Sequence, residues 1–362
     1  MSHPLAKLGS VTSDQHVPGR EDTLGRGFPW PPGSATGAGS MPGTDPLEAV
    51  RTVLDELPDV PHLPELPARG PGADMIGRTA ALLADLPVET TPVGWRLAPR
   101  PGLDLRRARD LLARDLDALE EAAAGYQGAL KIQVCGPWTL AAALELPASQ
   151  DMALADHGAV KDLTASLAEG VREHAAEVRR RVPAATLLVQ LDEPQLPAVL
   201  DGAVPTASGW RRYPAVETGP AADGLRAILA AAGGFGLVHC CAAAVPIGII
   251  RQAGAHAVYL DLDLLRRGDE DPLAEAVEAG TGIFAGAVQP LGNERPEAAG
   301  LAKRIVDLWR RLGLPLAGTA GQVVIAPGCG LAGASPEHAV AVLAACREAG
   351  RILPEMIEEG DS

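Results

Sequence analysis

The chain has 362 residues, a formal net charge of −15 at pH 7 and an isoelectric point near 5.0. Its length allows one large barrel-type domain or two ordinary domains. The excess of acidic residues argues against nucleic acid or an anionic membrane surface as the main partner, because both attract basic patches.

The cysteine content and the N-terminus indicate a cytoplasmic protein. The five cysteines are scattered, whereas a secreted disulfide scaffold is short and dense in cysteine, so we expect reduced thiols. The N-terminus "MSHPLAKLGSVTSDQHVPGRED" lacks the apolar core of a signal peptide. No charge-free run of about 18 apolar residues predicts a membrane span.

Residues 1–34 are rich in Gly, Pro, Ser and charge, and we expect a flexible lead-in. Residues 35–356 are predicted to form a single domain. Short apolar runs that end in turn residues predict its strands. Weaker strand signals lie at residues 35–43, 61–65 and 89–97. The clear strands are residues 131–137, 186–194, 236–241, 257–261, 282–288 and 322–330.

Amphipathic segments between these runs predict helices. They cover residues 45–58, 103–126, 163–182 and 335–350, and the last begins with Ser335 and Pro336 and closes on Gly350. About eight strand-then-helix units predict an α/β fold, specifically a (β/α)8 TIM barrel. A doubly wound open sheet is the alternative, but the glycine-rich nucleotide motifs usual in that fold are absent.

Reactive side chains fall at the ends of the predicted strands, where the active site of a parallel barrel forms. His239 and Cys241, in "VHCC", share a face of extended backbone and could supply two zinc ligands. Cys329, in "APGCG", ends another strand between glycines that free the backbone to turn. Asp261 could add a carboxylate, although a strand-end aspartate often caps the next helix. Buried packing cysteines or a structural zinc site are the alternatives.

Three further side chains are candidates for substrate binding. Asp192, in "VQLDEP", could hold an ammonium group, or this pair of acids could cap a helix. Ser40, in "GSMPGT", could bind a carboxylate, or it could simply form a turn. Glu65 could also bind an amine, although a solvated loop glutamate would look the same. For Trp138 the alternatives are a platform for a ring and plain packing.

These stretches, in this order, resemble the catalytic C-terminal half of the cobalamin-independent methionine synthase family. That family's barrel is shared by uroporphyrinogen decarboxylases and methylcobamide:thiol methyltransferases. The similarity spans residues 35 to 352 and is carried by "GAGSMPGTD", "KIQVCGPWTLA", "LLVQLDEPQL", "VHCC", "AVYLD" and "VIAPGCGL". The resemblance implies the zinc ligands His239, Cys241, Asp261 and Cys329, and the homocysteine-binding residues Ser40, Glu65 and Asp192.

The resemblance further implies a zinc-dependent methyltransferase that methylates the thiol of homocysteine to form methionine. The methyl donor would be methylcobalamin or methyltetrahydrofolate, with a corrinoid protein as a candidate partner. Three features depart from the family. The chain is about half as long as the full enzyme, aspartate replaces glutamate at position 261, and residues 286–296 lack the family's proton-donating histidine.

Other functions stay open at this stage. They are methyl transfer to another thiol or corrinoid within the same fold, and a non-catalytic zinc-binding or metallochaperone barrel. A uroporphyrinogen decarboxylase activity fits less well, because that chemistry uses no metal and would leave the cysteines without a role.

Overall fold

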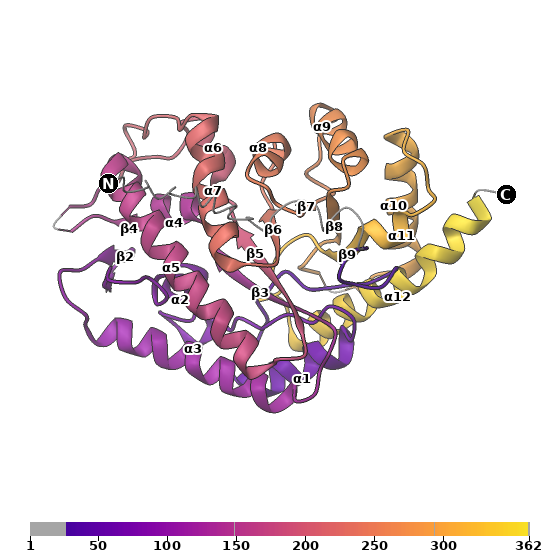
Figure 1. The fold of residues 1–362 in the computed structure, drawn as a ribbon, viewed down its shortest axis with the longest axis horizontal. Coiled ribbons are helices and arrows are strands. Elements are labelled where there is room, and N and C mark those ends of the chain that lie inside the picture. Colours follow the sequence, from indigo (N-terminus) through magenta and orange to yellow (C-terminus); the bar gives the residue numbers. More distant parts are fainter. Residues whose placement is uncertain (1–26, 148, 293, 361–362) are drawn as a thin grey trace, which may run out of the picture.

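The computed structural model describes residues 27–360 except residues 148 and 293. Its centre is a curled sheet of six parallel strands in the order β3-β5-β6-β7-β8-β9, with helices around it (Figure 1). The strands are β3 (Ala129–Cys135), β5 (Thr186–Asp192), β6 (Phe235–Cys240), β7 (Ala257–Asp261), β8 (Gly282–Val288) and β9 (Val323–Pro327). All six clear sequence predictions are confirmed, and for β7 and β8 even the bounds agree.

Two extended segments, residues 34–41 and 61–65, connect the edges of this sheet through isolated bridges. Ala35 pairs with Ile325 of β9, Ser40 pairs with Glu65, and His62 pairs with Lys131 of β3, each in the parallel sense. These bridges lie at the first two of the three weaker strand signals.

The third weak signal, residues 89–97, was predicted as one strand but forms a hairpin outside the main sheet. Strand β1 (Val88–Thr91) pairs antiparallel with β2 (Gly94–Leu97), and β4 (Leu144–Glu145) pairs parallel with β2. The reversal falls at Pro92 and Val93, between the paired residues Thr91 and Gly94.

Helices cover the outside of the sheet. In Figure 1, α1 and α3 lie along the lower side of the molecule and α8, α9 and α10 along the upper side. The α-helices are α1 (Pro46–Glu56), α2 (Met75–Ala80), α3 (Leu103–Ala122), α4 (Pro137–Ala143), α5 (His157–Arg181), α6 (Leu196–Leu200), α7 (Thr218–Ala232), α8 (Ile247–Gln252), α9 (Arg267–Glu278), α10 (Ala298–Arg311), α11 (Thr319–Gln322) and α12 (Pro336–Gly360). Short 3₁₀ turns lie at Pro67–Arg69 and Ala153–Ala155.

Two of the predicted helices run further than expected. Helix α12 passes Gly350 and continues to Gly360, because the buried Leu353 and Ile357 extend its apolar face. Helix α5 begins at His157 rather than residue 163, where the side chain of Asp156 accepts a hydrogen bond from the Ala159 N–H and caps the helix.

The buried apolar side chains form two clusters, because successive residues of a strand face opposite sides of the sheet. The larger cluster lies between the strands and the helices. The smaller one contains alternate residues on the inner side of the sheet, together with Ala38 of the first bridging segment and Val60 just before the second. The sheet residues include Leu188, Leu237, Ala257, Tyr259, Phe284, Val324 and Ala326. The inner surface of the curled sheet is thus a packed core.

The predicted lead-in lies mostly outside the described residues, but residues 27–34 are described. The ring of Trp30 is buried edge-on against Phe235 and Phe284, and its Nε1 donates to the Gly321 carbonyl at 3.1 Å. These eight residues therefore pack as part of the folded domain.

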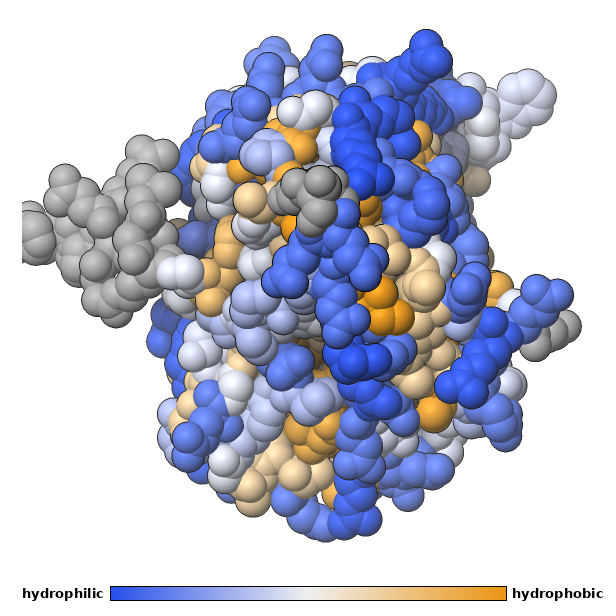
Figure 2. All heavy atoms as spheres, turned by 90° about the vertical axis from the view of Figure 1, so that its right-hand side faces the viewer, coloured by the Kyte–Doolittle hydropathy of each residue, from blue (hydrophilic) through white to orange (hydrophobic). Residues whose placement is uncertain are grey.

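The outer surface is mixed in character. Figure 2 shows the side that faces right in Figure 1, where hydrophilic and apolar residues are interspersed. Among the described helices, none is both long enough and apolar enough to cross a membrane.

Candidate active site

Strand register brings the predicted site residues to one end of the sheet. Asp192, the last residue of β5, lies directly beside His239 of β6, and His239 lies beside Tyr259 of β7. Asp261 ends β7 opposite Gly286 of β8. Because parallel strands end together, polar groups from distant parts of the sequence meet at this carboxyl-terminal edge.

Two of the predicted zinc ligands form a thiol pair. The Sγ atoms of Cys241 and Cys329 lie 3.3 Å apart although 88 residues separate them in the sequence. The hydrogen bond between them lowers the pKa of Cys329 and raises that of Cys241, and the nearby His239 ring and the Gly330 N–H also favour a Cys329 thiolate. Cys329 is therefore the first of the pair to lose its proton.

His239 presents one ring nitrogen to this region and anchors the other. Its Nδ1 lies 2.7 Å from Oδ1 of Asp192, while its Nε2 is buried with no hydrogen-bond partner among the described residues. The ring packs on Tyr259, with the ring centroids 4.2 Å apart. An imidazole held at Nδ1 by a carboxylate is the usual arrangement of a metal-binding histidine.

Asp261 is buried beside the loop that carries Cys329. A Cβ on Gly328 would come within 2.7 Å of the Asp261 Oδ2, so only glycine allows this approach. The Oδ1 atom accepts a hydrogen bond from the Asp263 N–H at 2.9 Å. Asp261 therefore stabilises its own turn and does not cap α9, the next helix.

Ser40 and Glu65 lie next to each other, and Ser40 contacts Gly330, the residue that follows Cys329. The Ser40 carbonyl accepts from the Leu331 N–H at 2.8 Å, and the Ser40 Oγ fills the space where a Cβ on Gly330 would lie. Glu65 is only 6% exposed, so it is not a solvated loop residue. Burial raises its pKa to about 7, against the attraction of Arg78 and with added repulsion from Asp192.

The two adjacent acids at the end of β5, Asp192 and Glu193, have different roles. The Glu193 carboxylate turns away from His239 and accepts from the backbone N–H groups of Trp138 and Thr139, at 2.9 and 2.8 Å, and from the Thr139 hydroxyl at 2.7 Å. It thus caps α4, the helix that follows β3. Asp192 remains at the site, with Oδ1 bound to His239 and to Gln190.

Other residues considered from the sequence are structural. Trp138 is buried and donates from Nε1 to the Ala221 carbonyl, so it packs rather than offering a platform. Cys240 is fully buried, and the alternation along β6 turns it to the opposite face of the strand from His239.

A layer of buried polar residues in β3 and β5 was not predicted from the sequence. Lys131, Gln133 and Gln190 occupy inward positions of β3 and β5 among apolar neighbours. The available signal was the alternation of polar and apolar letters in "KIQVC" and "LVQLD", which marks polar residues on one face of each strand.

The donor types present fit zinc. In the described part of the chain, no three His, Cys, Asp or Glu side chains are already gathered as a metal site. However, two thiols in contact and a buried imidazole nitrogen without a partner are the sulfur and nitrogen donors that zinc prefers. His239, Cys241 and Cys329 are the residues that could hold the metal, with Asp261 as a fourth.

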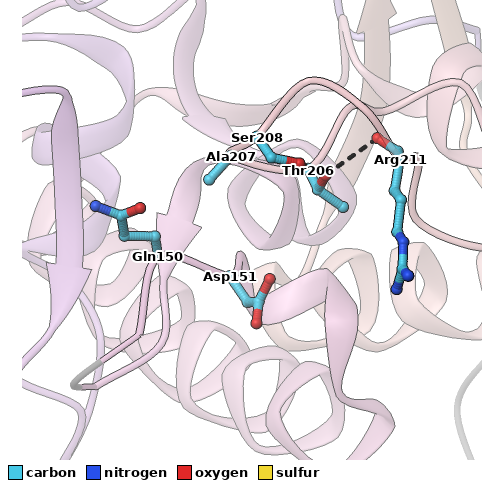
Figure 3. A pocket seen from close by; sticks show the side chains of 6 residues that line it. All are labelled: Gln150, Asp151, Thr206, Ala207, Ser208 and Arg211. Carbon is cyan, nitrogen blue, oxygen red and sulfur yellow. Dashed lines mark hydrogen bonds between the residues drawn. The ribbon is translucent and has the colours of Figure 1, made fainter.

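A separate hollow of about 420 Å³ lies between the loops at residues 150–151 and 206–211 (Figure 3). Thr206 Oγ1 donates to the Arg211 carbonyl across it at 3.1 Å. Its side chains are exposed except for the half-buried Thr206, and none is a predicted site residue. It therefore offers no dry, polar environment for catalysis.

Comparison with solved structures supports the fold. The chain is similar to a B12-independent methionine synthase from Shewanella sp. W3-18-1 in complex with selenomethionine, with 10% identity and a TM-score of 0.61 over 91% of this chain and 100% of that one. It is also similar to a methyltransferase from Methanosarcina mazei, with 14% identity and a TM-score of 0.54 over 84% and 86% of the two chains. No protein-family model and no curated protein matches the sequence. At these identities the likeness shows the fold alone.

Proposed function

We propose that the six strands and the two bridging segments form a (β/α)8 barrel whose carboxyl-terminal mouth is the active site of a zinc-dependent thiol methyltransferase. The substrate would be homocysteine and the product methionine. The observation that carries the proposal is the contact between the Cys241 and Cys329 thiols beside a buried, unpartnered His239 Nε2.

Zinc bound by these residues would keep a substrate thiol deprotonated near neutral pH, where a free thiol with a pKa of about 8.5 is mostly protonated. The sulfur lone pair then forms the S–CH3 bond while the bond between the methyl carbon and the donor breaks. The electron pair of that bond stays with the donor. With two thiolates, the protein would add negative charge that favours this nucleophilic attack.

In this proposal Ser40, Glu65 and Asp192 would hold the amino-acid end of homocysteine. The Ser40 side chain is half-exposed beside the Cys329 loop, so its hydroxyl can donate to a carboxylate. Glu65, whose burial raises its pKa to about 7, would ionise fully when an ammonium group arrives. Asp192 would offer Oδ2 to the same ammonium, because its hydrogen bonds to Gln190 and His239 both involve Oδ1.

A corrinoid is the methyl donor that suits this chain best. Methyl transfer from methyltetrahydrofolate must protonate a nitrogen leaving group, which needs a general acid. The loop after β8 has no histidine, and its Gln289 is bound to Asp263. Methylcobalamin leaves as cob(I)alamin and needs no proton.

The test combines metal analysis with an assay of methionine formation from homocysteine, run with each donor. We expect about one zinc per chain, loss of zinc in Cys241→Ser, and methionine formation with methylcobalamin. Cys240→Ala is the matched control, since this neighbouring thiol is buried on the opposite face of β6 from His239 and its loss should leave the zinc content unchanged. Near-stoichiometric zinc in Cys241→Ser would refute the assignment of the ligands. Bound zinc without methyl transfer from either donor would refute the activity.

A further inference from the structure

A fully buried lysine lies at the bottom of the candidate site. Lys131 has an exposed fraction of 0%, and its Nζ donates to the Ala38 carbonyl at 2.9 Å, to Gln133 Oε1 at 3.4 Å and to Gln190 Oε1 at 2.7 Å. Burying an ammonium group is costly, and an apolar side chain would fill the same space without that cost. The lysine therefore calls for an explanation beyond packing.

Lys131 determines which way the Gln190 amide points. Burial lowers the pKa of Lys131 to about 7, so the group is an ammonium up to about neutral pH. An ammonium group has only donors, so the amide then turns its oxygen toward Nζ. The Gln190 Nε2 then donates to the Ala38 carbonyl at 2.9 Å and to Asp192 Oδ1 at 2.7 Å. The reversed amide would place donor against donor at Lys131 and oxygen against oxygen at both other contacts.

The same reasoning extends from Asp192 to His239. A carboxylate oxygen only accepts, so Asp192 Oδ1 accepts from Gln190 Nε2 and also from His239 Nδ1, at 2.7 Å each. The proton of the neutral imidazole is thereby placed on Nδ1. The buried Nε2 carries the lone pair, which is the form in which a histidine binds a metal.

We propose that Lys131 and Gln190 are positioning residues, which orient the Asp192 carboxylate so that His239 keeps its proton on Nδ1 and its free lone pair on Nε2. This inference rests on the proposed function for its purpose, a zinc site, but not for its geometry. An unbroken sequence of hydrogen bonds runs from Lys131 Nζ through Gln190 and Asp192 to His239. Neither residue would touch the substrate or the metal.

The test measures the imidazole directly in metal-free protein. Nitrogen-15 NMR of histidine-labelled protein, with His239 assigned from a His239→Gln variant, reports which ring nitrogen carries the proton. At about pH 7, near the lowered pKa of Lys131 and above the ordinary imidazole pKa of about 6.5, we expect one neutral tautomer with the proton on Nδ1. Gln190→Met removes the donor to Asp192 and Lys131→Met frees the amide, so both should give a mixture of tautomers.

Zinc affinity is the second readout, measured by competition with a chromophoric chelator. Gln190→Met and Lys131→Met should each weaken binding about tenfold, as loss of a group that orients a metal-binding histidine does. Gln133→Met is the matched control, because Gln133 also contacts Lys131 in the buried interior but does not lie between it and Asp192. It should keep both the tautomer and the affinity of the parent protein.

The outcomes separate this inference from the proposed function. A single Nδ1–H tautomer that is lost in both variants supports the positioning role even if the parent protein binds no zinc, a result that would refute only the proposed function. An unchanged tautomer with affinity within twofold in Gln190→Met would overturn the positioning role. Equal effects in Gln133→Met, or failure of both variants to fold while this control folds, would also overturn it in favour of plain structure.

Discussion

Replacing Asp192 by asparagine distinguishes the role expected from the sequence from the role suggested by the geometry. The sequence predicts that Asp192 binds the substrate ammonium, whereas its Oδ1 lies 2.7 Å from His239 Nδ1. Asparagine keeps an acceptor oxygen in the same place but removes the charge. Both partners are nearly buried, with exposed fractions of 7% for Asp192 and 5% for His239, so water cannot replace the lost interaction.

We expect the substitution to weaken zinc binding. Loss of the group that orients a metal-binding histidine weakens metal binding by about 10- to 100-fold, which equals about 1.4 to 2.7 kcal/mol. The assay is zinc competition with a chromophoric chelator, followed by the KM for homocysteine in zinc-saturated protein. Asp263→Asn is the control, because this exposed aspartate lies on the same rim and pairs with Arg304. Zinc affinity within about threefold of the parent protein, with a raised KM alone, would refute the role of Asp192 as the partner of His239.

Three further predictions concern stability. Glu193→Gln should lower the free energy of unfolding by about 2 kcal/mol in urea titrations, because an amide cannot accept all three hydrogen bonds at the start of α4. Burial raises the folded-state pKa of Glu65 from 4.5 to about 7, so the stability that the protonated carboxyl contributes is fully present below pH 4.5 and is lost as the pH rises toward 7. Between pH 4.5 and 7, the free energy of unfolding of Glu65→Gln should therefore rise by about 3 kcal/mol relative to that of the parent protein. Removing zinc with a chelator should lower the midpoint of thermal unfolding in the parent protein and in Cys240→Ala, but not in Cys241→Ser.

Much of the architecture could be predicted from local pattern. The strands β7 and β8 are runs of apolar residues between turn residues, so period and punctuation define them within the sequence. The segment at residues 89–97 shows where this fails. Its turn at Pro92 and Val93 reverses the chain, and the two halves pair as a hairpin outside the main sheet. The predicted end of α12 is wrong for a similar reason, since burial of Leu353 outweighs the tendency of Gly350 to end a helix.

The candidate site divides in the same way. Strand-end residues such as His239 and Cys329 could be identified because parallel strands end at a common edge, so position in the sequence implies position in space. The different roles of Asp192 and Glu193 could not be predicted. They depend on the N-terminus of α4, which begins more than fifty residues earlier and donates hydrogen bonds to the Glu193 carboxylate. Which of two adjacent acids serves the site is decided by a contact that no local pattern contains.

Lys131 shows what the curvature of the sheet adds. In the sequence it is a single charged letter in an apolar run, 61 residues before Asp192 and 108 before His239. In the structure its three acceptors come from Ala38 in a bridging segment, from β3 itself and from β5. An exposed lysine would have water as its partner and could not constrain Gln190. Burial removes the water, and each hydrogen bond then restricts the next group, so that a cation deep in the core can act on an imidazole at the rim.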